Sequence, residues 1–137
     1  MIVVHTGQEQ GFWTGGENNR FLQTFLNSGA YPQVHGLSVG MVIVPPNTEG
    51  GMHDHREAQE IWYVLEGEGQ MQVGDEICDI APGDLVYGPK QVMHQIINNR
   101  DEKDLKALLI LCPGGDEENV VKALAQGKGV VYQSERN

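Results

Sequence analysis

Short runs of β-forming residues, separated by turns at even intervals, dominate the middle of the chain. These runs cover residues 34–44, 60–66, 70–73, 76–80, 84–88, 93–98 and 105–112. The turns between them are rich in glycine and proline, for example Pro45-Pro46, Gly74-Asp75 and Pro82-Gly83-Asp84. Short strands interrupted in this way are typical of an antiparallel sandwich or barrel. We therefore predict an all-β protein whose barrel core covers residues 34–112.

The two ends of the chain follow a different pattern. Residues 17–28 carry phenylalanine and leucine at a helix-like spacing, although Asn18, Asn19 and Gly29 weaken that prediction. Residues 116–125 begin with acidic side chains, continue with an apolar stripe and are followed by Gly127, which predicts one short helix. We expect the last residues either to return as an edge strand or to dock on a neighbour. A chain of 137 residues fits a single domain, so we predict one domain over residues 1–137 with short helical or irregular extensions.

The charge of the chain excludes some classes of partner. Nine basic and nineteen acidic residues give a formal net charge of −10. Nucleic acids and anionic membranes both require a basic surface, so neither is expected as a partner. A small anionic substrate remains compatible with the charge, because a bound divalent cation would dominate the field close to it. The amino-terminal sequence has neither a basic flank nor a long apolar run, which predicts a cytoplasmic protein without a signal peptide.

The chemistry of the chain is concentrated in a few histidine and glutamate residues near strand ends. His53 and His55 are two residues apart, so in an extended segment they point to the same side. Glu60 begins the next strand after a polar turn, and His94 opens another strand further along the chain. Three imidazoles and one carboxylate suit a divalent transition metal, and in a five- or six-coordinate site they leave one or two positions open. An open position distinguishes a reactive metal from a structural one.

Two segments resemble the sequence motifs of the cupin family. The segment from His53 to Gly67 resembles the first motif, with two histidines, Glu60 and a glycine at the family's spacing. The segment from Gly83 to Asn98 resembles the second motif and includes His94. The resemblance covers roughly residues 34–112. The sequence departs from the motifs at two positions, where Gln91 and Asn47 replace the glycines that the family commonly has.

The resemblance implies a fold and a set of ligands. Cupins are small jelly-roll β-barrels, also called double-stranded β-helices, with a metal ion inside the barrel near one mouth. The family's four ligands correspond to His53, His55, Glu60 and His94. The implied cofactor is one divalent transition metal per chain, either Fe, Mn, Ni or Zn. Cupins are commonly dimers, so we also predict a homodimer, in which Phe12-Trp13 either covers the barrel or pairs two subunits.

Other residues are weaker candidates for function. Trp62 is expected to face inward, where it either packs the barrel or forms an aromatic wall over a bound substrate. Gln91 either faces solvent in a turn or places its amide near the metal pocket. Tyr87 can donate a proton or a hydrogen bond, or it serves the structure alone. Glu60 can act in catalysis as an acid or base if it leaves the metal.

Three functions fit the predicted site, because a fold does not determine an activity. The first is a metal-dependent enzyme of the dioxygenase or oxidoreductase type, acting on a small oxygen-containing substrate. The second is a redox-neutral isomerase or lyase that uses the same site. The third is a non-catalytic protein that binds a small ligand through its metal. The open coordination positions favour an enzyme over a binding protein.

Overall fold

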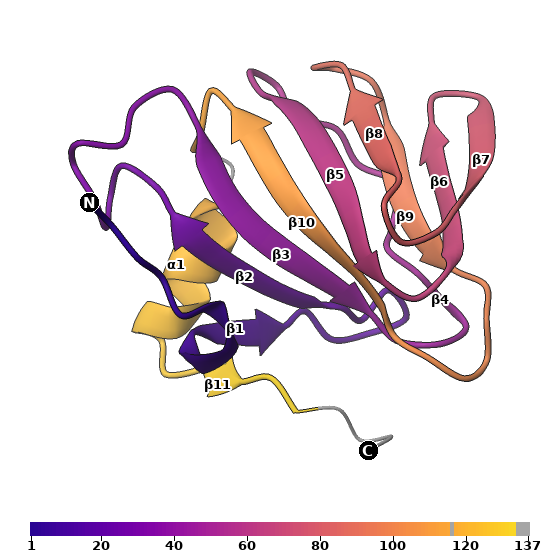
Figure 1. The fold of residues 1–137 in the computed structure, drawn as a ribbon, viewed down its shortest axis with the longest axis horizontal. Helices are drawn as coiled ribbons and strands as arrows, with labels where there is room; N and C mark the ends of the chain where they lie inside the picture. Colours follow the sequence, from indigo (N-terminus) through magenta and orange to yellow (C-terminus); the bar gives the residue numbers. More distant parts are fainter. Residues whose placement is uncertain (116, 134–137) are drawn as a thin grey trace.

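The computed structural model describes residues 1–115 and 117–133, and in them two β-sheets face each other (Figure 1). The large sheet has the strand order β11-β1-β2-β3-β10-β5-β8, and the small sheet has the order β4-β9-β6-β7. All strand pairs in both sheets are antiparallel. The strands of the large sheet are β1 (Gln10–Trp13), β2 (Phe21–Leu26), β3 (Ser38–Val44), β5 (Gln59–Glu66), β8 (Leu85–Gly88), β10 (Leu105–Cys112) and β11 (Val130–Val131). Those of the small sheet are β4 (Thr48–Glu49), β6 (Gly69–Val73), β7 (Glu76–Ile80) and β9 (His94–Asn98).

The main hydrophobic core lies between the two sheets. Alternate residues of β3 and β5 point into it, so that Val42, Val44, Trp62 and Val64 are almost completely buried. The small sheet contributes Met71, Ile80 and Ile96, and β10 contributes Leu105 and Ala107. The period of two in these strands therefore fills the barrel with aliphatic side chains and one indole ring.

A second apolar cluster covers the opposite face of β2 and β3. It consists of Phe21, Phe25, Met41 and Ile43, and partly buried side chains from both ends of the chain pack on it, including Val4 and Tyr132. Trp13 belongs to the same surface, since its ring lies 5.3 Å from that of Phe21 and 6.1 Å from that of Tyr132. The side chain of Trp13 thus packs within its own chain, and the predicted homodimer remains a prediction.

The central strands lie close to where the sequence predicts them. The β-rich runs from residue 60 to residue 112 correspond to β5 to β10, with boundaries that differ by one residue at most. The run at 34–44 begins later, at Ser38 in β3. The large sheet also extends beyond residues 34–112, because β1, β2 and β11 add to its edge.

The predicted helix at residues 17–28 is wrong, because Phe21–Leu26 form strand β2. Apolar residues four positions apart share a face in a helix and also in a strand, so their spacing does not separate the two. Both faces of β2 are covered, one by the second apolar cluster and the other by the barrel interior. This arrangement produces an apolar pattern without simple alternation.

The carboxyl-terminal helix is shorter than predicted. Helix α1 covers Glu118–Ala125, whereas Asp116, the first residue of the predicted range, lies outside the described residues. Val120 and Ala123 are buried where α1 packs on β1 and β2, beside the large sheet (Figure 1). After the helix, Val130–Val131 pair with β1 as an edge strand, which is one of the two predicted arrangements. Within the described residues, no helix has both the length and the apolar character that crossing a membrane requires.

Candidate metal centre

Backbone hydrogen bonds bring the two histidine segments together. The N–H of His53 donates to the carbonyl oxygen of His94 at 3.0 Å, and the N–H of His94 donates to the carbonyl oxygen of His53 at 2.7 Å. A third bond joins the N–H of Gln91 to the carbonyl oxygen of His55 at 2.8 Å. Residues about forty positions apart in sequence are therefore fixed next to each other before any metal is considered.

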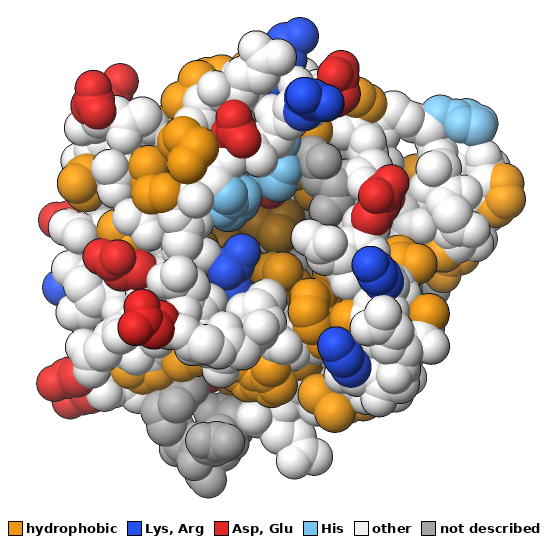
Figure 2. Space-filling view, turned by 180° about the vertical axis from the view of Figure 1, so that it is seen from behind, with side chains coloured by type: hydrophobic (Ala, Val, Ile, Leu, Met, Phe, Trp, Pro, Cys, Tyr) orange, Lys and Arg blue, Asp and Glu red, His pale blue; other side chains and the backbone are white. Residues whose placement is uncertain are grey.

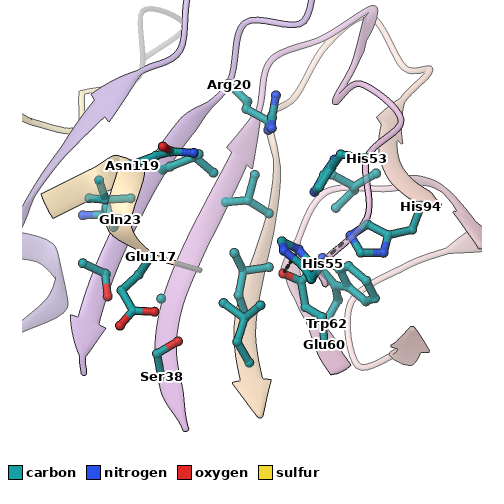
Figure 3. Close-up of a pocket in the computed structure, with 18 residues that line it drawn as sticks. Arg20, Gln23, Ser38, His53, His55, Glu60, Trp62, His94, Glu117 and Asn119 are labelled. Atoms are coloured by element: carbon teal, nitrogen blue, oxygen red, sulfur yellow. Dashed lines mark ion pairs between the residues drawn. The ribbon is translucent and has the colours of Figure 1, made fainter. Parts of the chain in front are cut away.

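The four predicted ligands lie together at one wall of the barrel (Figure 3). One ring nitrogen from each of His53, His55 and His94 falls within 4.8 Å of the others. Glu60 lies on β5 and is 4% exposed, and its carboxylate bridges two of the rings. Its Oε1 is 3.4 Å from Nε2 of His55, and its Oε2 is 3.4 Å from Nε2 of His94. The structure thus brings His53, His55, Glu60 and His94 into a single group.

The surroundings favour neutral imidazoles at this site. Burial, followed by the repulsion of His53 and His55, lowers the pKa of His94 to about 3. Burial also lowers the pKa of His53, although its hydrogen bond to Gly51 opposes this effect. His53 Nδ1 lies 2.8 Å from the carbonyl oxygen of Gly51, a contact in which the ring nitrogen must be the donor. This tautomer leaves the Nε2 lone pair of His53 available to a metal.

The donor set fits a transition metal. His94 is 1% exposed, and apart from the 3.4 Å contact with Oε2 of Glu60, its Nε2 has no hydrogen-bond partner in the described part of the chain. A buried polar nitrogen without such a bond costs free energy, and a metal ion would satisfy it. Three imidazole nitrogens with one carboxylate suit Fe, Mn, Ni or Zn better than Mg or Ca, which prefer oxygen ligands.

A cavity of about 140 Å³ opens next to the histidines. Figure 2 shows the corresponding hollow, with histidine side chains at its edge, a basic side chain beside them and apolar side chains deeper inside. Aliphatic residues of the large sheet and β9 form much of its wall, namely Leu22, Val42, Ile96, Leu109 and Leu111. The site therefore combines a few polar groups with a water-excluding wall, as small-molecule sites do.

Trp62 packs directly against the candidate metal ligands. Its indole ring is 2% exposed, lines the cavity and lies 4.7 Å from the ring of His94 in a T-shaped arrangement. Gly88, paired with Glu60 in the neighbouring strand, provides the space for this ring. A Cβ atom at residue 88 would lie 2.7 Å from Cζ3 of Trp62. The position of Trp62 fits both of its predicted roles, packing and contact with a substrate.

Two of the weaker candidates lie outside the cavity. Tyr87 pairs with Ile61 on the outward side of β5 and β8; it is 53% exposed and donates its hydroxyl hydrogen to Oε1 of Gln59 at 2.9 Å. Gln91 is exposed, and its amide donates to the carbonyl oxygen of Arg56 at 3.3 Å. Neither residue lines the cavity. Their positions do not support the predicted roles in catalysis and substrate binding.

Several polar residues that line the cavity were not predicted from the sequence. They come from β2, β3, α1 and the residues just before β2 and α1, and comprise Arg20, Gln23, Thr24, Ser38, Glu117 and Asn119. Figure 3 shows Gln23, Ser38, Glu117 and Asn119 on the side of the cavity opposite the histidines, whereas Arg20 lies next to His53. In a strand at residues 21–26, alternate residues share a face, so Arg20, Leu22 and Thr24 lie on the same side. Because a helix was predicted there, this alternation was not used to find the cavity-lining residues.

Comparisons with known proteins agree with this architecture. Residues 40–111 match the family described as the cupin domain. An uncharacterised protein of Methanocaldococcus jannaschii is 36% identical over 82 residues, which are 60% of this chain and 65% of that protein. An oxalate-binding protein of Thermotoga maritima is 31% identical over 70 residues, which are 50% of this chain and 58% of that protein. The chain therefore spans less than two thirds of the length of both curated relatives.

A solved structure supports the same fold. The crystal structure of a predicted oxalate decarboxylase from Thermotoga maritima superposes with a TM-score of 0.72 and 21% sequence identity, covering 82% of this chain and 100% of that one. At this identity the likeness concerns the fold alone, which is the all-β jelly roll that the sequence predicts. Because the family match also covers more than half of the described residues, the chain belongs to the cupin family.

Proposed function

We propose that the protein is a metal-dependent enzyme that acts on a small oxygen-containing substrate inside the barrel. The observation that carries this proposal is the group of His53, His55, His94 and Glu60 beside a largely apolar cavity. These four residues would hold one divalent Fe, Mn, Ni or Zn ion. When bound, the ion would supply a Lewis acid for a substrate oxygen or a site for dioxygen activation.

The residues around the ion have separate tasks in this proposal. His53 is held in one tautomer by Gly51, so its Nε2 keeps a fixed direction. Glu60 either completes the ligand set or takes a proton from the bound substrate, since its carboxylate faces two rings inside the cavity. Trp62 and the aliphatic wall exclude water, which strengthens every electrostatic interaction at the site.

Three functions are compatible with the same residues. The enzyme is either of the oxidoreductase type, with dioxygen as a reactant, or a redox-neutral isomerase or lyase. A non-catalytic binding protein is the third possibility, and its specific support is the similarity to the oxalate-binding protein of Thermotoga maritima.

Metal analysis of the untagged protein, paired with a His53→Ala variant, tests the proposal. We expect close to one transition-metal ion per chain in the parent protein and a large loss in the variant. Oxygen consumption during turnover of candidate substrates then separates the oxidoreductase from the isomerase or lyase. A parent protein that binds no transition metal would contradict the proposal. A metal-loaded protein that binds ligands without turning any over would support the binding protein instead.

A further inference from the structure

Arg20 is the single lysine or arginine among the cavity-lining residues that the structure describes. It immediately precedes β2, on the same face as Leu22 and Thr24, and Figure 3 shows its guanidinium directed into the space beside His53. The chain as a whole has a net charge of −10, so the charge of this side chain is opposite in sign to that of the whole protein. An anionic partner in the cavity would stabilise the guanidinium at this position.

The backbone around Arg20 holds the side chain in place. Its N–H donates to Oγ1 of Thr14 at 3.1 Å, and its carbonyl oxygen accepts the N–H of Thr14 at 3.0 Å. The guanidinium donates through one nitrogen to the carbonyl oxygen of Asn18 at 3.2 Å. One side of the guanidinium is therefore anchored, whereas its remaining donors are available to a ligand.

Within the described residues, no carboxylate forms an ion pair with Arg20. Burial lowers the pKa of Arg20, and the more distant charge of Glu60 only partly offsets this effect. Glu117 is the other carboxylate at the cavity, and it accepts the N–H of Gly115 at 2.6 Å. A partly buried guanidinium without a carboxylate partner is costly in the free protein, and an anionic ligand would remove that cost.

A shallow depression outside the cavity continues the positive charge. Arg20 lines both spaces, and Lys122 and Lys128 line the depression together with Asn119 and Gln126. Both lysines are exposed on or just after α1. Three basic residues thus line two adjoining spaces, although Glu60 and Glu117 also line the cavity. At the side of the cavity where Arg20 lies, this positive charge favours a small anion over a neutral molecule.

The cavity also limits the size and the remaining chemistry of the ligand. Its volume of about 140 Å³ is small and corresponds to roughly five water molecules at about 30 Å³ each, so only a ligand with a short carbon chain fits. At the end of the cavity away from Arg20 lies Ser38, which is 1% exposed and whose Oγ has no hydrogen-bond partner among the described residues (Figure 3). A polar substituent on the ligand would satisfy this hydroxyl.

We propose that the substrate of this site is a small organic acid with a hydroxyl or carbonyl oxygen next to its carboxylate, and that Arg20 binds the carboxylate. The adjacent oxygen would then face the histidine group, and the aliphatic wall would enclose the short carbon chain. This inference rests on the proposed metal-dependent function and adds the substrate class to it. Arg20 is the residue that distinguishes an acid from a neutral compound of the same shape.

Ligand binding to the cobalt-loaded full-length protein tests the inference. Lactate and pyruvate are titrated in parallel with lactamide and pyruvamide, which keep the shape and lose the charge, and binding is followed by calorimetry and by the visible spectrum of the cobalt. We expect each acid to bind at least about tenfold more tightly than its amide. We expect Arg20→Met to weaken acid binding about 10- to 100-fold, since hydrogen bonds to charged groups are lost, and to weaken amide binding much less, since a neutral acceptor is lost there.

Further variants keep the test decisive. Arg20→Lys retains the charge but not the planar fork and should fall between the parent and Arg20→Met. Arg100→Met is the matched control, because Arg100 lies on the surface and pairs with Glu68. The inference is wrong if acids and amides bind equally, if neither binds at millimolar concentration, or if Arg100→Met has the same effect as Arg20→Met.

The experiments distinguish a wrong assignment of Arg20 from a wrong proposal of metal-dependent function. The same titrations on the metal-free protein show whether the preference for acids exists without the ion. Absence of cobalt binding would overturn the metal-dependent function. If the parent protein binds acids no more tightly than amides, both with and without the metal, the assignment of Arg20 would be overturned. Tight, Arg20-dependent binding of acids without turnover would overturn only the enzymatic activity.

Discussion

Asn47 and Gln91 are the two residues other than glycine with positive φ in the described part of the chain, at 55° and 63°. They are also the two positions at which the sequence departs from the glycines of the cupin motifs. The glycines of the family therefore correspond to left-handed backbone conformations, which glycine adopts without a steric penalty. Asparagine tolerates this region well, whereas glutamine does so less readily.

The conformation of Gln91 leads to a prediction about stability. We expect Gln91→Gly to leave stability unchanged or raise it by up to about 1 kcal/mol, because relief of strain competes with the greater entropy of an unfolded glycine. Gln91→Val should destabilise by about 1–3 kcal/mol, since β-branched residues disfavour positive φ. Urea denaturation of both variants measures the two changes. Equal stability of the glycine and valine variants would show that backbone strain at residue 91 is negligible.

Asn98, the last residue of the second motif, has a structural task. It is completely buried, and its amide donates to the carbonyl oxygens of Val44 and Lys103 at 2.9 and 2.8 Å. We expect Asn98→Leu to destabilise the protein by about 2–4 kcal/mol, because two carbonyl acceptors lose their donor. Asn99→Leu, at the exposed neighbouring position, is the control and should change stability by less than about 0.5 kcal/mol. Chemical denaturation provides the comparison, and similar losses in both variants would contradict the assigned task.

At the scale of elements, strand β2 was mispredicted as a helix, whereas the strands from β5 to β10 were predicted correctly. The runs from β5 to β10 are delimited by turns, so local residues were sufficient to predict them. Phe21–Leu26 instead pack apolar residues on both faces, and the covering segments include Val4 and Tyr132, from opposite ends of the chain. Burial by segments distant in the sequence therefore decides the structure of this segment, and the spacing of apolar residues within 17–28 contains no information about those distant segments.

The pairing of β5 with β8 provides a prediction about the metal site. Gly88 contacts the ring of Trp62, and an added Cβ would also lie 3.5 Å from Nδ1 of His94. We expect Gly88→Ala to destabilise by about 1–3 kcal/mol through overpacking. It should also weaken metal binding, because Trp62 must shift and its ring lies 4.7 Å from that of His94. Gly7→Ala is the matched control, since nothing lies within 4 Å of a Cβ there. Denaturation and metal titration check both effects, and unchanged metal affinity in Gly88→Ala would show that Trp62 moves elsewhere.

At the scale of the whole molecule, the candidate site divides into two halves with different origins. The histidine half follows from two short motifs, whose spacing identified His53, His55, Glu60 and His94. The rest of the lining includes Arg20, Ser38 and Asn119, which come from the residue before β2, from β3 and from α1 and meet only in the folded chain. No spacing in the sequence joins them. The residues proposed to select the substrate were therefore less predictable than those proposed to hold the metal.

The pH dependence of the metal-free protein reflects the burial of its histidines. The folded-state pKa of His94 is about 3 and that of His53 is also lowered, whereas an unfolded histidine titrates near ~6.5. Below pH ~6.5 the unfolded chain therefore binds protons that the folded chain does not, and stability falls as the pH decreases. The net charge of −10 acts in the opposite direction, but relief of that repulsion requires carboxylates to be protonated, mainly near pH ~4.

The interval between pH 6.5 and pH 5 consequently isolates the histidine effect. We expect the free energy of unfolding to decrease in this interval by up to about 1.4 kcal/mol per pH unit for each additional proton that the unfolded chain binds. A His94→Gln variant removes one of these protons, so its slope should be smaller than that of the parent protein. Urea denaturation in the presence of a chelator, at several pH values, measures both slopes. Identical slopes would mean that His94 takes up a proton in the folded barrel. The proposed metal site requires a neutral, buried imidazole at His94, so that requirement would not be met.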